Sequence, residues 1–393
     1  MMIEKVFKIS VLLCCVCMAS CSPSPESGPE SVMISLPETC SGARYNLEIF
    51  KHLATLQEQP NTLALYQDHT VLVLESGANA ISAYEQTTGQ LNRNFSDIGN
   101  DHNPYDFAIA QSEHLAFVSN NLANSFSVVD LTSGDVVHEV VEDTMLSPSG
   151  IAVSQDFVFV SDVQFGMGDN GFGRGMIHLF DRQSLMFLGS LHTEQQNPHY
   201  LHYLEDSDEL LVVNSGAVGF VDGHYRQRSD GGISLWKFHA DDPLNPEQRN
   251  APVPVFPDTL WRDGAPGRPL ITADGEHMYF VSATSPVLLK LDRGSLEWEI
   301  DPTMPHVLYE TSQDALHAAA MMGDGLAFVL AFNQDALYVF DTTCDKLIAG
   351  PVDLGLSEED LEGPLAIVSD GALRAHFITS LSKRLGAIYL RPQ

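Results

Sequence analysis

Cysteines are the residues best able to do chemistry in this 393-residue chain, and four of them lie close together near its start. Cys14, Cys15, Cys17 and Cys21 fall within eight residues, a spacing that could bind a metal ion or form disulfides. However, two lysines precede them, and residues 9–18 form a short apolar run without charge. That order is typical of a secretory signal peptide, and the run is shorter than the ~20 residues of a membrane-spanning helix. Most of this cysteine cluster is therefore expected to leave with the signal peptide.

Residues 18–21 read Met-Ala-Ser-Cys and resemble the bacterial lipobox, in which small residues precede a cysteine that becomes lipidated. The resemblance implies that residues 1–20 are a signal peptide and that Cys21, bound to membrane lipid, is the mature N-terminus. The alternative is ordinary cleavage nearby, which would leave a free thiol at Cys21. Ser22 rather than Asp follows the cysteine, which by resemblance to enteric lipoproteins favours the outer membrane of the cell envelope. Residues 21–40 begin with a Pro/Ser/Gly-rich acidic stretch, and we expect them to form a flexible tether.

The remaining two cysteines, Cys40 and Cys344, lie far apart in the chain. An even number of cysteines in an oxidising compartment permits one disulfide, which would tie the N-terminal arm to a late segment. Two separate reduced thiols are the alternative.

Histidines are the second group of residues that could do chemistry, as ligands of a metal ion. His102, His199 and His317 each fall near the start of an apolar segment, and His202 lies within one. If the fold brings these imidazoles together, they could bind zinc or another divalent metal. The alternative is histidines that hydrogen-bond to water. His199 and His202 are three residues apart, which places them on opposite faces of a strand unless the strand bends.

The charge of the chain limits its partners. The formal net charge is −32, from 20 basic and 52 acidic residues. Because nucleic-acid binding requires Lys and Arg to neutralise phosphates, we exclude nucleic acid as a partner. The charge favours cations and basic partners, or it serves only to solvate the surface.

A repeated pattern indicates the elements that position these residues. A typical copy has a proline near its start, an apolar stretch, a polar turn, a β-rich stretch, and then a third strand that ends in a turn with Asp or Glu and Ser or Thr. Self-similar units of about 40–50 residues with four short strands are typical of propeller blades. Residues 45–53 can supply the fourth strand of the last unit, which closes the ring and hides both edges. We therefore predict an all-β, seven-bladed β-propeller over residues 41–393, with copies that start near residues 60, 103, 147, 197, 266, 314 and 363.

Individual repeats also resemble a known family. Residues 117–120, Phe-Val-Ser-Asn, and residues 127–134, Ser-Val-Val-Asp-Leu-Thr-Ser-Gly, are similar to the repeats of YVTN-type seven-bladed propellers. The resemblance extends over about residues 45–393 and implies the fold. It says almost nothing about function, because propellers host many unrelated activities.

Two long loops depart from the minimal repeat, residues 163–175 in the third blade and residues 216–231 in the fourth. They are expected on the same face of adjacent blades, and they combine glycine with aromatic residues and arginine. Long loops in compact folds are usually functional or disordered. Two arginines near the start of the fifth blade could reach the same place and meet a carboxylate, with surface ion pairing as the alternative. The candidate binding residues are Phe165, Asp169, Phe172, Arg174, His224, Tyr225, Arg226, Arg262 and Arg268.

These observations lead to two functional hypotheses. The chain has no Gly-x-Ser-x-Gly, His-Glu-x-x-His or phosphate-loop motif, which favours a binding scaffold without catalysis. Such a scaffold would bind a protein or a small extracellular ligand through the top-face loops of blades three and four. The alternative is a metal-using propeller, either a lactonase-like hydrolase or a periplasmic metal carrier. In the hydrolase, the four histidines would hold the metal and Asp101 or Asp106 would act as base.

Overall fold

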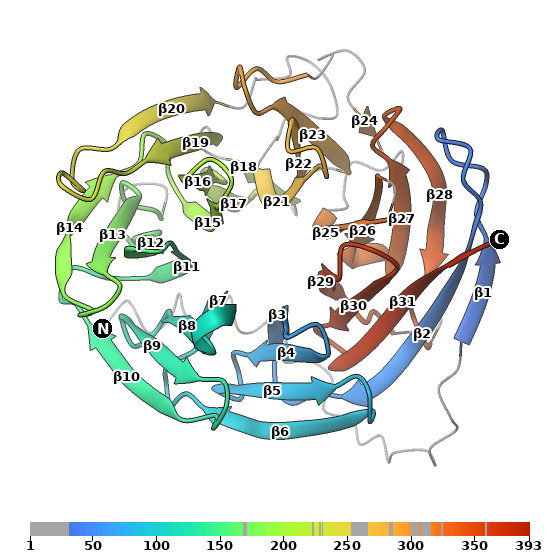
Figure 1. The fold of residues 1–393 in the computed structure, drawn as a ribbon, viewed down its shortest axis with the longest axis horizontal. Helices are drawn as coiled ribbons and strands as arrows, with labels where there is room; N and C mark the ends of the chain where they lie inside the picture. Colours follow the sequence, from blue (N-terminus) through green and yellow to red (C-terminus); the bar gives the residue numbers. More distant parts are fainter. Residues whose placement is uncertain are drawn as a thin grey trace.

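Seven antiparallel sheets form a ring around a central axis (Figure 1), which confirms the predicted seven-bladed β-propeller. The structure, a computed structural model, describes residues 31–167, 171–221, 224–227, 229, 231–252, 266–282, 286–299, 306–307, 316–323, 325–357 and 360–393.

Each blade has its first strand next to the axis, and the blades are numbered along the chain. Blade one consists of β3 (Pro60–Tyr66), β4 (Thr70–Glu75), β5 (Ala80–Glu85) and β6 (Gln90–Asp97). Blade two consists of β7 (Pro104–Ala110), β8 (Leu115–Asn120), β9 (Ser125–Asp130) and β10 (Val136–Val141). Blade three consists of β11 (Pro148–Val153), β12 (Phe157–Asp162), β13 (Met176–Asp181) and β14 (Phe187–His192).

The next three blades follow the same order. Blade four consists of β15 (Pro198–Leu204), β16 (Glu209–Asn214), β19 (Gly232–Lys237) and β20 (Glu247–Pro252), with a hairpin of β17 (Val218–Val221) and β18 (His224–Gln227) between β16 and β19. Blade five consists of β21 (Pro266–Ile271), β22 (His277–Ser282), β23 (Val287–Asp292) and β24 (His306–Val307). Blade six consists of β25 (Leu316–Met322), β26 (Leu326–Ala331), β27 (Ala336–Asp341) and β28 (Lys346–Asp353).

The seventh blade joins the two ends of the chain. Strands β29 (Pro364–Ser369), β30 (Arg374–Thr379) and β31 (Arg384–Pro392) are followed outward by β2 (Tyr45–Thr55) and β1 (Ser31–Ser35). The two short 3₁₀ helices are η1 (Gln111–Glu113) and η2 (Phe332–Gln334). No helix among the described residues is long and apolar enough to cross a membrane.

The strand sequences reflect where each strand lies in its blade. Middle strands are continuous apolar runs because both of their faces are buried between blades: all six residues of β26 are buried. Outer strands have one face in solvent, so the outermost strand β10 exposes His138 and Glu139. Six of the seven innermost strands begin with proline, which has no N–H to donate and therefore suits the first position of a strand.

Ring closure follows the prediction, with one correction. Strand β2 pairs with β31, as expected for residues 45–53. However, residues 31–35, which we expected in the flexible tether, form β1 and pair with β2 at the rim of blade seven (Figure 1). The expected tether boundary at residue 40 was therefore wrong. The reason is that Ile34 packs against the core of the closing blade and Leu36 is buried there.

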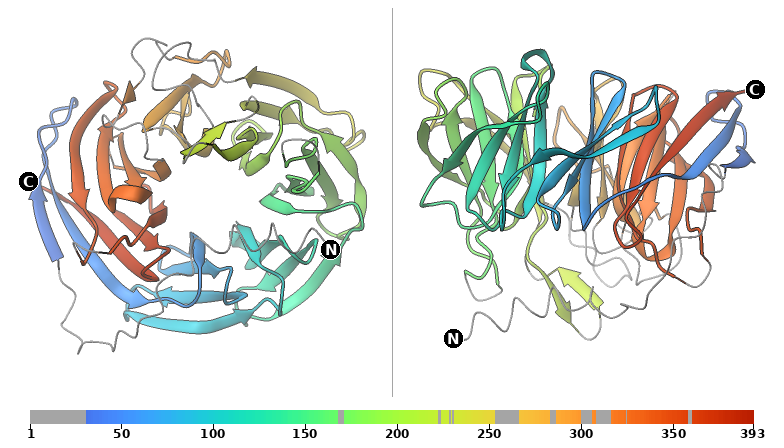
Figure 2. Two further views of the ribbon diagram at one scale, coloured as in Figure 1. Left: turned by 180° about the vertical axis from the view of Figure 1, so that it is seen from behind. Right: turned by 90° about the horizontal axis from the view of Figure 1, so that it is seen from below.

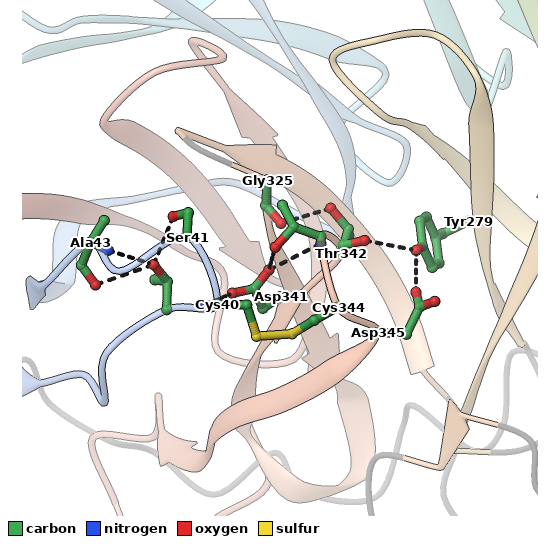
Figure 3. The surroundings of a disulfide bond; sticks show 11 residues. Cys40, Ser41, Ala43, Tyr279, Gly325, Asp341, Thr342, Cys344 and Asp345 are labelled. Carbon is green, nitrogen blue, oxygen red and sulfur yellow. Dashed lines mark hydrogen bonds between the residues drawn. A yellow bond between two sulfur atoms is a disulfide. The ribbon is translucent and has the colours of Figure 1, made fainter.

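Cys40 and Cys344, the pair predicted from the sequence, form a disulfide bond (Figure 3). Their Cα atoms are 6.3 Å apart, and the bond joins positions 304 residues apart in the chain. The backbone N–H of Cys40 donates to Oδ2 of Asp341 at 2.8 Å, and Oδ1 of Asp341 accepts from the backbone N–H of Thr343 at 3.0 Å. The N-terminal arm is thus fastened to the turn after β27.

Candidate functional site

A β-bulge near the start of every innermost strand determines which side chains reach the axis. In each of the seven pairs of first and second strands, the register shifts just after the first residue. A bulge leaves an extra residue unpaired and redirects its side chain. The polar side chains within these bulges are those of Asn61, Tyr105, Ser149, His199, Arg268 and His317.

Tyr105 and His199 meet across the ring. The Tyr105 hydroxyl is hydrogen-bonded to Nε2 of His199, although β7 belongs to blade two and β15 to blade four. Burial lowers the pKa of His199 to about 4, with smaller contributions from Arg268 and His317, and burial raises the pKa of Tyr105. At neutral pH the tyrosine is therefore protonated and donates to a neutral imidazole.

Asp106 and Arg268 form a second contact across the axis. Nη2 of Arg268, from blade five, donates to Oδ1 of Asp106, from blade two, at 3.0 Å. The guanidinium carbon of Arg268 also lies 4.9 Å from the ring centroid of Tyr200, a cation–π contact. Burial is the largest single influence and lowers the pKa of Arg268, but the charge and hydrogen bond of Asp106 together with Tyr200 and Tyr105 outweigh it, so the pKa is raised overall. Arg268 thus meets a carboxylate, as the sequence suggested, and the carboxylate belongs to the opposite side of the ring.

The four histidines proposed as metal ligands are not brought together. His102 lies apart from the axis, where its Nε2 is 2.9 Å from Oε1 of Glu139 on the outermost strand β10 of its own blade. Among the described residues, no group of three or more His, Cys, Asp or Glu ligand atoms within 4.8 Å of one another includes His102, His199, His202 or His317. The expectation that these histidines converge was therefore wrong for His102, because the turn before β7 directs its ring outward.

His202 and His317 lie nearer the axis. His199 lies in the bulge between Pro198 and Tyr200, whereas His202 lies beyond it and pairs with Leu211. Burial in the channel wall lowers the pKa of His202, and the nearby Arg268 cation lowers it further. The His202 side chain nevertheless keeps contact with solvent. Burial also lowers the pKa of His317 to about 4, and its ring lies 5.0 Å from that of Phe332.

Other clusters of metal-binding side chains lie elsewhere. One consists of Asp341 with the two disulfide cysteines, whose sulfurs are bonded to each other. The remaining two surround His277 on blade five, where Oε2 of Glu299 is 3.4 Å from His277 and 3.1 Å from Nζ of Lys290. The lysine already neutralises that carboxylate.

The described residues of the blade-three loop lie on the top face, which we define as the face where the innermost strands begin. Phe165 and Phe172 form an isolated β-bridge with their ring centroids 5.6 Å apart. The backbone N–H of Gly166 donates to the carbonyl of Gly171 at 2.9 Å, and Gln196 of the next blade donates to the carbonyl of Phe172 at 3.1 Å. These bonds hold Phe165 in solvent with 47% of its surface exposed.

The other predicted binding residues are only partly described. Arg174 is exposed in the blade-three loop, while Asp169 and Arg262 lie outside the described residues. The blade-four loop forms the β17–β18 hairpin, which projects from one face of the ring (Figure 2, right). His224, Tyr225 and Arg226 lie in β18, where only the backbone can be described.

A cavity of about 1310 Å³ opens on the bottom face, where the innermost strands end. Its walls come from blades one to four, and Asp106 and Arg268 lie at its inner end. Sequence reasoning missed this cavity because its lining residues belong to ordinary short turns. It also missed Tyr105 and Tyr200. A usable signal existed for Tyr105, since both Tyr105 and His199 directly follow the first proline of their strands.

The lowered pKa values predict a stability that depends on pH. In the folded protein His199 and His317 stay neutral down to about pH 4, whereas unfolded histidines bind protons below 6.5. The unfolded state thus binds more protons in this window, so stability should fall as the pH drops from 6.5 to 4. We expect about 1–2 kcal/mol from each of these half-buried rings.

Urea unfolding at pH 7.5, 5.5 and 4.5 checks this expectation. The His199→Gln/His317→Gln variant should lose less stability on acidification than the wild type, although buried His376, with a pKa near 4, remains in both. His192→Gln, at an exposed histidine, is the control. Equal acid sensitivity in the double variant and the control would contradict the assignment.

Comparisons with known proteins agree on the fold. No protein-family model matches the chain, and no curated protein matches it in sequence. The chain is similar to the solved structure of streptogramin B lyase, with a TM-score of 0.63 and 14% identity over 88% of this chain and 98% of that chain. A catalytically inactive histidine-to-alanine variant of virginiamycin B lyase from Staphylococcus aureus with quinupristin has a TM-score of 0.65 and 12% identity, over 88% and 100%.

A third similar structure has a different activity. Hydrazine synthase of Kuenenia stuttgartiensis has a TM-score of 0.60 and 12% identity over 86% of this chain and 97% of that chain. At such identities the likeness shows the propeller fold alone. Because the lyases and the synthase share this fold, it does not select one activity for the chain.

Proposed function

We propose that the protein is a binding scaffold of the cell envelope, anchored through lipid on Cys21, which presents its top face to a partner protein. The observation that carries this proposal is the exposure of Phe165 and Met167, at 47% and 51%, on a loop held by its own backbone hydrogen bonds. Ordered apolar side chains in solvent are typical of contact sites, because burying them against a partner contributes binding free energy.

The surroundings of this loop support a protein partner. The β17–β18 hairpin of the adjacent blade extends the same face, which gives a broad surface rather than a small pocket. The net charge of −32 favours a partner with a basic surface through faster and more selective association. The metal-using alternative receives less support, since His102 lies apart from the axial histidines.

Site-specific photo-crosslinking in intact cells tests this proposal. A photoreactive phenylalanine analogue replaces Phe165 or Met167 in the full-length protein, and Met186 serves as the matched control. Met186 is 63% exposed in the turn between β13 and β14, on the bottom face of the same blade. Because apolar residues at the centre of an interface lie within reach of the partner, both top-face positions should give one discrete adduct after irradiation.

The control position decides the interpretation. Met186 should give no such adduct, and mass spectrometry of the shared top-face adduct should identify one partner protein. Adducts of equal intensity at all three positions, or none at Phe165 and Met167, would overturn the proposal.

A further inference from the structure

The bottom-face cavity lies apart from the proposed top-face contact site. The Asp106–Arg268 pair, whose charges are joined at 3.0 Å, forms part of its wall. Its volume of about 1310 Å³ exceeds the roughly 300–1,000 Å³ of ordinary small-molecule pockets. The cavity can therefore hold an extended ligand.

The charged residues of the cavity give it a negative character. Both arginines in its wall are already engaged, Arg182 by Glu113 and Arg268 by Asp106. The other carboxylates of the wall are exposed and have no salt-bridge partner within the part of the chain that the structure describes. These carboxylates belong to Asp156, Glu205, Asp208 and Asp241.

A buried acceptor at the inner end is a second, independent feature. Asp106 is only 5% exposed and lines the cavity, yet only its Oδ1 has a partner, Arg268. No donor among the described residues reaches Oδ2. An oxygen at the cavity wall without a protein donor can accept a hydrogen bond from a ligand N–H group.

Aromatic rings line the same wall. Tyr203 donates its hydroxyl to Oδ1 of Asp208, and its ring stacks on Phe159 with centroids 6.3 Å apart. Phe238 lies 4.8 Å from Phe159, and both Tyr203 and Phe238 are half-buried. Partly exposed rings beside carboxylates suit organic cations, which gain from cation–π contact as well as from charge.

We propose that this cavity binds a linear organic polycation, a polyamine-type molecule with several ammonium groups. A single metal ion fits less well, because no group of three described ligand atoms within 4.8 Å of one another includes these carboxylates. Charges spread along a flexible chain match carboxylates that are spread around a large cavity. The ring walls contact the methylene segments between the ammonium groups.

Isothermal titration calorimetry with spermine on the full-length protein in detergent tests the proposal. We expect saturable binding of one spermine per chain at low salt. Asp156→Asn/Glu205→Gln should weaken it about tenfold, since two partly shielded ion pairs are lost. The matched control is Asp143→Asn/Glu194→Gln, which removes the same charge from exposed top-face positions and should change the affinity less than about twofold.

Two further arms complete the experiment. Phe238→Leu should weaken spermine binding a few-fold if the ring contributes cation–π contact. A tetralysine peptide distinguishes the sources of the cation: tighter binding of spermine assigns the cavity to free polyamines, and tighter binding of tetralysine assigns it to a basic peptide segment. Equal loss of affinity in the two double variants, or no saturable binding of either probe, would overturn the proposal.

Discussion

Replacing both Cys40 and Cys344 by serine is expected to lower the free energy of unfolding by about 3–5 kcal/mol. The bond joins positions 304 residues apart, so its removal frees a long loop in the unfolded chain. Loop entropy grows with loop length, which places this disulfide near the upper end of the usual range. In the folded variant the ring is still closed by the pairing of β2 with β31.

The native contacts near the disulfide indicate that the loss of stability on its removal comes mainly from the higher entropy of the unfolded chain. Asp341, which accepts the N–H of Cys40, also accepts the N–H and hydroxyl of Thr343. It therefore keeps hydrogen-bond partners when the arm loosens, and no unpaired buried charge results.

Urea unfolding of the wild type and the double variant, each with and without reductant, measures this effect. Reductant should bring the wild type to the stability of the variant and leave the variant unchanged. A loss below about 1 kcal/mol would mean that strand pairing alone closes the ring and that the unfolded chain is already compact.

Removing the positive charge of Arg268 at the ring axis should produce the second large loss of stability. In Arg268→Met, Asp106, which is only 5% exposed in the wild type, loses the one side-chain partner that its carboxylate has among the described residues. Breaking a buried ion pair by removing one member costs about 3–5 kcal/mol, and the 32% exposure of the Arg268 side chain reduces the expected loss to about 2–3 kcal/mol.

A second substitution separates charge from packing. Asp106→Asn/Arg268→Met should regain most of the lost stability, because a neutral pair of similar volume leaves no unpaired charge at a largely buried position. Arg174→Met makes the same chemical change at an exposed loop position and should stay within about 0.5 kcal/mol of the wild type. If the single and double variants are equally unstable, the loss is due to packing of the long arginine side chain against Tyr200.

The two proposed binding sites occupy opposite faces and can be tested separately. The top-face loop of Phe165 and Met167 is bonded within itself and to blade four, independently of the bottom cavity. Substitutions at Asp156 and Glu205 should therefore leave the crosslink through Phe165 unchanged. Loss of both activities together would indicate unfolding, which the urea measurements detect.

Some features of this protein were determined by the sequence alone. Seven blades follow from a local pattern, in which buried middle strands must be apolar throughout and a proline suits the first position of an inner strand. Ring closure by residues 45–53 follows because the last repeat has only three strands and an open edge is unfavourable. The Cys40–Cys344 pair follows from having two cysteines in the segment expected to be mature and folded.

Only the tertiary structure decided which side chains meet at the axis. Tyr105 and His199 are 94 residues apart, and Asp106 and Arg268 are 162 apart, so their contact depends on the closed ring rather than on spacing. The bulges matter as well: His199 is left unpaired in the bulge of β15, and an unpaired residue has its side chain redirected from the alternation of the strand. The cavity walls combine short turns of several blades, and no local pattern relates those turns to one another. Strand periodicity is a property of neighbouring residues, whereas the two proposed binding surfaces depend on the arrangement of whole blades around one axis.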